Sequence, residues 1–156
     1  MYFKISSLKH FLLLLAIAHY ANCNIQQQCL TDTAAEVQIL RKEFGDYETD
    51  STVDDHVVRK FFLCLFQKNG VMKSDGSVDV PNFREYIKLL VSKYGNLPTR
   101  LQDYVKSMLN DINDGLFKDT IEKNTIKLVN GVKLVFMGIH YGEGGGNNDL
   151  FDVIME

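Results

Sequence analysis

"CLFQKNGVMKSDGSVDVPNF", residues 64–83, joins the end of one apolar helix pattern to the start of another through a short polar loop. Asp75 and Gly76 form a pair that is typical of turns. Asp79 and Pro81 suit the N-cap and the first turn of a following helix. The stretch therefore predicts two helices joined by a tight connection.

The same loop has some features of an EF-hand calcium loop. With Gly76 at the sharp-turn position, Asp75 falls on a ligand position. Val71 and Lys73, however, also fall on ligand positions, and Asn82 stands where a bidentate glutamate is required. The register therefore fails, and we expect no calcium site.

The N-terminus has the pattern of a secretory signal peptide. Two lysines precede the apolar run "FLLLLAIA", residues 11–18, which is too short to span a bilayer. We expect cleavage after Cys23, so that residues 1–23 are removed, with a cut after Ala18 as the rival. The protein is then secreted and extracellular.

Cleavage after Cys23 leaves two of the three cysteines, Cys29 and Cys64. A secreted chain favours pairing, so we expect one disulfide. It would close a loop of about 36 residues and stabilise the fold by roughly 3–4 kcal/mol. Two unpaired buried thiols are the alternative.

Charge disfavours nucleic acid as a partner. Removal of the signal takes two of the 17 basic residues and none of the 20 acidic ones, so the mature net charge is 15 − 20 = −5. A net negative surface repels a phosphate backbone. We also expect no membrane association after signal cleavage.

Helical spacing of apolar residues predicts an all-α fold, a compact bundle of five to six amphipathic helices with one disulfide. The predicted helices span residues 33–44, 56–67, 82–94, 99–112 and 116–130. Capping boxes are indicated at Thr33 and Thr99, each with a Glu or Gln three residues later. Gly131 is the candidate C-terminal cap of the last helix.

The C-terminal third is less regular. Residues 132–141, "VKLVFMGIHY", are apolar without a clean period, so helix and extended chain both stay open. We expect a domain over residues 24–141 and a flexible Gly-rich tail over 142–156. The last part of the tail, "LFDVIME", is either disordered or folds back over or into a cavity.

Candidate chemistry is sparse. Zinc needs four N or S ligands, and the mature chain offers His56, His140 and two cysteines that are expected to pair. A Gly-x-Ser-x-Gly elbow and a local Cys/His signature are both absent from the sequence. We therefore expect no enzyme, no metal and no cofactor.

The stretch at residues 64–83 resembles the third-cysteine region of the insect odorant-binding protein family, which includes the pheromone and general odorant-binding proteins. In that family a helix carries the second and third cysteines at C-x-x-x-C spacing, and a turn and the next helix follow. Lys60 occupies the place of the second cysteine, and no cysteine follows Cys64. The chain looks like a divergent, cysteine-poor member, and the resemblance implies the Cys29–Cys64 pairing.

The resemblance also implies a helical cavity that carries a small hydrophobic molecule, such as an odorant, a pheromone or a lipid-like ligand, without catalysis. Aromatic, Met and Leu side chains suit such a lining. For each residue, filling the core is the alternative to lining a cavity. The expected ligand-binding residues are Val57, Phe61, Phe62, Leu65, Phe66, Met72, Phe83, Tyr86, Leu90, Tyr104, Met108, Phe117 and Phe136.

A second hypothesis is a secreted interaction protein, for example a venom, salivary or seminal component, that uses the same scaffold without ligand transport. The loss of cysteines favours such drift. Under either hypothesis, a receptor or a second copy of the chain is the candidate protein partner.

Overall fold

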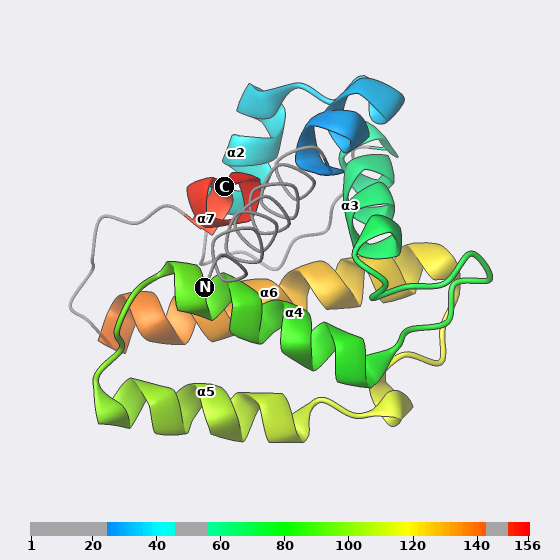
Figure 1. Ribbon diagram of the computed structural model, residues 1–156. Coiled ribbons are helices and arrows are strands. Elements are labelled where there is room, and N and C mark those ends of the chain that lie inside the picture. The colour runs from blue at the N-terminus through cyan, green and yellow to red at the C-terminus, as the bar shows by residue number, and fades with distance from the viewer. Residues whose placement is uncertain (1–24, 46–55, 143–149) are drawn as a thin grey trace, which may run out of the picture.

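The computed structural model of the protein describes residues 25–45, 56–142 and 150–156 (Figure 1). The predicted signal peptide, its cleavage site and Cys23 lie outside these residues. Within them the chain is helical apart from its connections and one isolated bridge between Met72 and Val78. None of the helices in these ranges is long and apolar enough to cross a membrane.

The described helices follow one another along the chain with short links between most of them. Residues 25–33 are helical, and a short 3-10 helix, η1, lies between residues 111 and 121. The bundle confirms the predicted all-helical fold. The elements are α2 (Val37–Gly45), α3 (His56–Lys68), α4 (Val80–Lys93), α5 (Thr99–Asp111), η1 (Asp114–Leu116), α6 (Ile121–Gly142) and α7 (Leu150–Met155).

The long helix α6 is the centre of the bundle. It packs on α3 and on α5, whereas α7 packs on α2 and α4. Figure 1 shows α4 and α5 side by side, with the turn after α4 reversing the chain. Residues 25–33, α2, α3 and α7 lie on the other side of α4 from α5.

Phenylalanine side chains form much of the core. Phe61, Phe62 and Phe66 of α3 and Phe136 of α6 are at most 2% exposed. Phe44 of α2 stacks on Phe62 with ring centroids 4.8 Å apart. These side chains belong to one apolar interior that α2, α3 and α6 share.

The predicted disulfide is confirmed. The sulfur atoms of Cys29 and Cys64 are bonded, across a sequence separation of 35 residues. Cys29 is fully buried, so the bridge attaches residues 25–33 to α3 from inside the bundle.

The loop between α3 and α4 is the predicted turn. Gly76 has φ +85°, a conformation that favours glycine, and the carboxylate of Asp75 accepts hydrogen bonds from the Ser77 N–H and hydroxyl. These bonds lower the pKa of Asp75. Asp79 caps α4 as predicted, since its side chain accepts from the Asn82 N–H at 3.0 Å. Both carboxylates thus serve the turn and the helix start.

The predicted cap at Thr33 is wrong. Thr33 ends the helix at residues 25–33, and its hydroxyl donates to the Cys29 carbonyl at 2.6 Å. The break before α2 comes at Ala34, which has φ +52°. This helix was not predicted, because residues 25–33 are mostly polar and lack an apolar helical pattern. The disulfide and contacts with neighbouring elements bury it instead. Val37 of α2 is 44% exposed, whereas Leu40 and Phe44, which share its helical face, are buried.

The predicted capping box at Thr99 is also wrong. Pro98 occupies the N-cap position of α5 and offers no side-chain hydrogen bond. Gln102 does reach backward, but its side-chain N–H donates to the Leu97 carbonyl at 2.7 Å. This bond ties the helix to the preceding turn and takes the place of the reciprocal box.

Helix α6 differs most from its prediction. It begins at Ile121, five residues after the predicted start at Leu116, and runs through Gly131 to Gly142. The undecided stretch at residues 132–141 is therefore helical. Gly131 is a contact point: a Cβ there would lie 3.3 Å from the Phe83 ring. The sequence signal of a cap thus reflects close packing of α6 on α4.

A groove between helices α4 and α5

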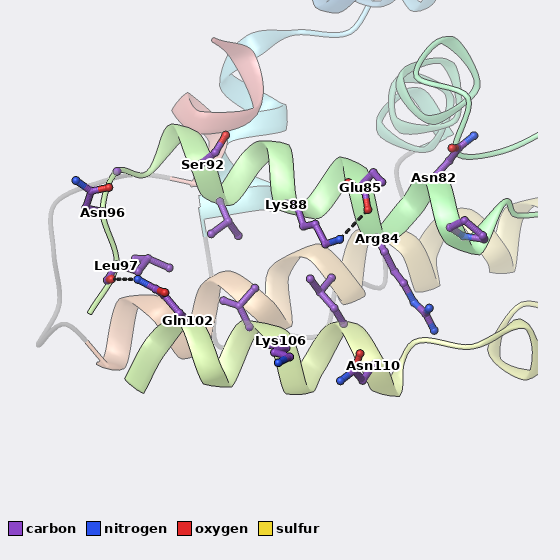
Figure 2. Close-up of a pocket in the computed structure, with 15 residues that line it drawn as sticks. Asn82, Arg84, Glu85, Lys88, Ser92, Asn96, Leu97, Gln102, Lys106 and Asn110 are labelled. Atoms are coloured by element: carbon purple, nitrogen blue, oxygen red, sulfur yellow. Dashed lines mark hydrogen bonds and ion pairs between the residues drawn. The ribbon is translucent and has the colours of Figure 1, made fainter. Parts of the chain in front are cut away.

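A groove of about 700 Å³ lies between α4 and α5, open to the surface (Figure 2). Both helices and the turn that joins them contribute to its walls. The lining residues are Pro81, Asn82, Arg84, Glu85, Lys88, Val91, Ser92, Gly95, Asn96, Leu97, Gln102, Val105, Lys106, Leu109 and Asn110.

The groove exists because α4 and α5 bury different faces against the rest of the bundle. The α4 stripe that includes Phe83, Ile87 and Leu90 is buried in the common core. Helix α5 packs on α6. The turn between the two helices contains Gly95 at φ +104°, which lets the chain reverse sharply. The surfaces that α4 and α5 turn toward each other are therefore only partly filled.

The floor of the groove is apolar. Leu97, Val105 and Leu109 are between 5% and 8% exposed, and Val91 of α4 is half-buried beside them. Burial of apolar ligand surface on such a floor stabilises the complex by about 25 cal/mol per Å². The site can therefore hold a small hydrophobic group.

The rim carries charge. Lys88 forms an ion pair with Glu85 at 2.7 Å, and both side chains are more than half exposed. Arg84 extends from α4 toward the end of α5, where one of its terminal N–H groups donates to the Ile112 carbonyl (Figure 2). Lys106 of α5 is exposed and makes no hydrogen bond or ion pair within the described ranges.

The residues predicted to bind ligand lie elsewhere. None of the thirteen lines the groove. Nine are buried in the core: Phe61, Phe62, Leu65, Phe66, Met72, Phe83, Tyr86, Leu90 and Phe136. The other four, Val57, Tyr104, Met108 and Phe117, are half-buried.

Two of the thirteen meet at a second, smaller pocket. Phe83 and Phe117 lie with ring centroids 5.9 Å apart, and both line a hollow of about 260 Å³ where α4, η1 and α6 come together. Lys127 and Asn130 stand at the same pocket, and Gly131 of α6 completes it.

The two tyrosines of the predicted set are neutral at physiological pH, as tyrosines ordinarily are. Burial raises the pKa of Tyr86 well above its usual value, and it raises the pKa of Tyr104 as well. The Tyr104 hydroxyl donates to the Leu134 carbonyl at 3.0 Å. The side chains of the predicted set thus present apolar or neutral surface at physiological pH.

Sequence reasoning missed the groove because it treats each helix alone. By helical spacing, Arg84, Glu85, Lys88 and Ser92 belong to the polar face of their helix. Val105 and Leu109 belong to the apolar face of theirs. A signal was present in the short break "GNLP", residues 95–98, which predicts neighbouring antiparallel helices. The spacing of apolar residues within each helix does not determine the distance between α4 and α5.

Metal chemistry finds no support in the described ranges, where no three His, Cys, Asp or Glu side chains gather closely enough to hold an ion. The charged side chains of the groove include a carboxylate that is already paired with a lysine. What the groove offers chemically is an apolar floor, amide groups and cations.

A family model described as the PBP/GOBP family matches residues 21–111, more than half of the chain. The matched segment ends at the last residue of α5, so it includes both walls of the groove and both disulfide cysteines. The comparison with curated proteins and the comparison with solved structures each found no match.

Proposed function

The chain belongs to the PBP/GOBP family, the insect odorant-binding family, and from this premise we propose that it is a secreted carrier for a small hydrophobic molecule. The family binds and carries ligands rather than transforming them, and the proposal includes no catalysis. The Cys29–Cys64 disulfide supports an oxidising, extracellular setting.

The groove between α4 and α5 is the observation that carries the proposal. Its volume of about 700 Å³ is in the range of small-molecule sites, roughly 300–1,000 Å³. Its floor is apolar and its rim is polar, which is the usual arrangement for orienting a largely apolar ligand. We place the ligand along this floor, over Leu97, Val105 and Leu109.

The thirteen residues expected to bind ligand remain part of the proposal in a different role. Most of them pack on one another, so a ligand would reach them only by displacing buried side chains. We propose that they form the packed core that holds the helices of the bundle in place. Phe83 and Phe117 are exceptions, because they already line the smaller pocket and offer a second place for an apolar group.

Displacement of a neutral fluorescent apolar probe tests the carrier function. The purified protein, with its disulfide intact, is titrated with the probe and then with a panel of fatty acids, terpenes and sterol-like compounds. We expect at least one class to compete. Failure of the probe and of every panel member to bind would count decisively against carriage.

A groove-filling substitution tests the location. Ser92 lines the groove on α4, and Ser92→Trp places a large ring in it. Ser107→Trp is the matched control, because Ser107 is exposed on α5 and is not part of the lining. We expect S92W to weaken probe binding about tenfold, a loss of about 1.4 kcal/mol, and S107W to leave it within about twofold. Equal binding by both variants would move the ligand out of the groove.

Native mass spectrometry of protein purified from its tissue separates carriage from the interaction hypothesis. A co-purifying small molecule is the result expected of a carrier. An empty chain held in a complex with another protein would favour a scaffold used for its surface.

A further inference from the structure

The charges of the groove are gathered toward one end. The lining residues Arg84, Lys88 and Lys106 are cations, and Glu85 is the one carboxylate among the lining residues. The lining residues from Val91 to Gln102, which form the other end, carry no charge. Because α4 and α5 run in opposite directions, the two lysines stand on facing walls of the charged end (Figure 2).

This end is positive on a chain that is negative overall. Three cations against one carboxylate leave the lining at 3 − 1 = +2, whereas the whole chain has a formal net charge of −3. A concave surface lined by one sign of charge concentrates ligands of the opposite sign. The uneven distribution therefore favours an anion at one end of the groove.

The cations are not equally available. Lys88 is paired with Glu85, and Arg84 donates to the Ile112 carbonyl, although its Nε is buried and has no hydrogen-bond partner. Lys106 has neither a hydrogen bond nor an ion pair within the described part of the chain. Of the three, Lys106 is the cation that a ligand can engage without breaking an existing bond.

We propose that the ligand of the groove is an anionic amphiphile, a long apolar chain that ends in a carboxylate. This inference rests on the proposed carrier function. The carboxylate lies between Lys106 and Lys88, and the chain runs over Val105 and Leu97 toward the uncharged end. A neutral ligand of the same length gains the apolar contacts but leaves Lys106 without a counter-charge.

Paired ligands of equal chain length test the charge requirement. Oleate and oleyl alcohol are compared as competitors of the neutral probe, each below its aggregation limit. We expect oleate to bind about fivefold to tenfold more tightly than the alcohol. Its advantage shrinks as salt rises, because exposed charges are screened over a Debye length of about 8 Å at physiological ionic strength.

Lysine variants test the place of the anion. Lys106→Gln removes the unpaired cation, and we expect about a threefold loss of oleate affinity, as for an exposed ion pair. The double variant K88Q/K106Q also frees Glu85 to repel the anion, so the expected loss is about tenfold. Lys42→Gln, at an exposed lysine of α2 away from the groove, is the matched control and leaves oleate binding unchanged. Oleyl alcohol binds all variants within about twofold.

The binding results distinguish failure of the anionic-ligand proposal from failure of the carrier function. Equal affinity for oleate and the alcohol overturns the anionic ligand and leaves the carrier function standing. Preference for oleate that survives in K88Q/K106Q also overturns it, because the anion then lies elsewhere. If neither the probe nor any competitor binds, this inference and the proposed function fail together.

Discussion

Gly138 of α6 lies directly against the ring of Tyr104 on α5. A Cβ at this position would come within 2.2 Å of the Tyr104 Cζ atom, far inside contact distance. The same tyrosine donates to the Leu134 carbonyl, one turn earlier on α6. The absence of a side chain at Gly138 therefore lets the ring lie flat on α6 and make this bond.

Gly138→Ala is expected to destabilise the protein, although alanine normally stabilises a helix interior by about 0.5–1 kcal/mol relative to glycine. The added methyl group displaces the Tyr104 ring and breaks its hydrogen bond, so we expect a net loss of about 1 kcal/mol. Urea unfolding of the wild type and the variant measures this change.

The Tyr104→Ala background provides the control. Once the ring is removed, G138A has nothing to displace and should stabilise by about 0.5–1 kcal/mol. The sign of the effect then reverses between the two backgrounds. The same sign in both would show that Tyr104 and Gly138 are not in close contact.

Helix α7 shows how much a short element can depend on its neighbours. It has six residues, and Leu150, Phe151, Val153 and Ile154 are at most 6% exposed. Such a short helix is unstable alone, so its order comes from packing on α2 and α4. The structure therefore shows "LFDVIME" folded against the bundle, and none of its residues lines the groove.

Polar contacts at both ends of α7 support that packing. Arg41 of α2 forms an ion pair with Asp152 at 2.7 Å and lies over the Phe151 ring, 5.0 Å from its centroid. The Gln26 side-chain N–H donates to the Ile154 carbonyl at 3.0 Å. These bonds attach the end of the chain to both N-terminal helices.

Phe151→Ala is expected to cost about 3–5 kcal/mol of unfolding free energy, because it removes a buried ring from the contact between α7 and the bundle. Asp152→Ala, at the next residue but exposed, removes only an ion pair on the surface and should cost less than about 1 kcal/mol. Thermal unfolding followed by circular dichroism compares the two. Equal costs would mean that α7 does not pack through Phe151.

At the scale of the whole molecule, the Cys29–Cys64 disulfide and the long helix α6 hold the described helices together. The Cys29–Cys64 disulfide attaches residues 25–33 to α3, and α6 then joins α3 to α5. Neither cysteine lines the groove, and Figure 1 shows residues 25–33 and α3 on the other side of α4 from α5. The disulfide and the proposed binding site are therefore in separate parts of the bundle.

The double variant Cys29→Ser with Cys64→Ser is expected to lower stability by about 3–4 kcal/mol, because the open chain has more conformational entropy when unfolded. Probe binding by the fraction that remains folded should stay within about twofold of the wild type, since the groove does not contain either cysteine. Urea unfolding and probe titration measure the two effects. A loss of binding that exceeds the loss of folded protein would instead link the disulfide to the groove.

Local patterning was sufficient for a large part of this architecture. The helical spacing predicted α3, α4 and α5 closely, the Asp75-Gly76 pair predicted the turn, and Asp79 with Pro81 predicted the start of α4. The number of cysteines predicted the disulfide. The helices, the turn and the helix start depend on residues that are near one another in sequence, and the disulfide depends on the number of cysteines. The sequence alone was therefore enough to predict them.

Contacts between distant segments settled the rest. Gly131 ends no helix because Phe83 packs against it, and residues 25–33 are helical although their sequence is polar. The groove depends on the spacing of α4 and α5, which periodicity does not encode. An amphipathic pattern identifies the apolar face of a helix, but what covers that face, and how completely, is decided only when all the helices pack together.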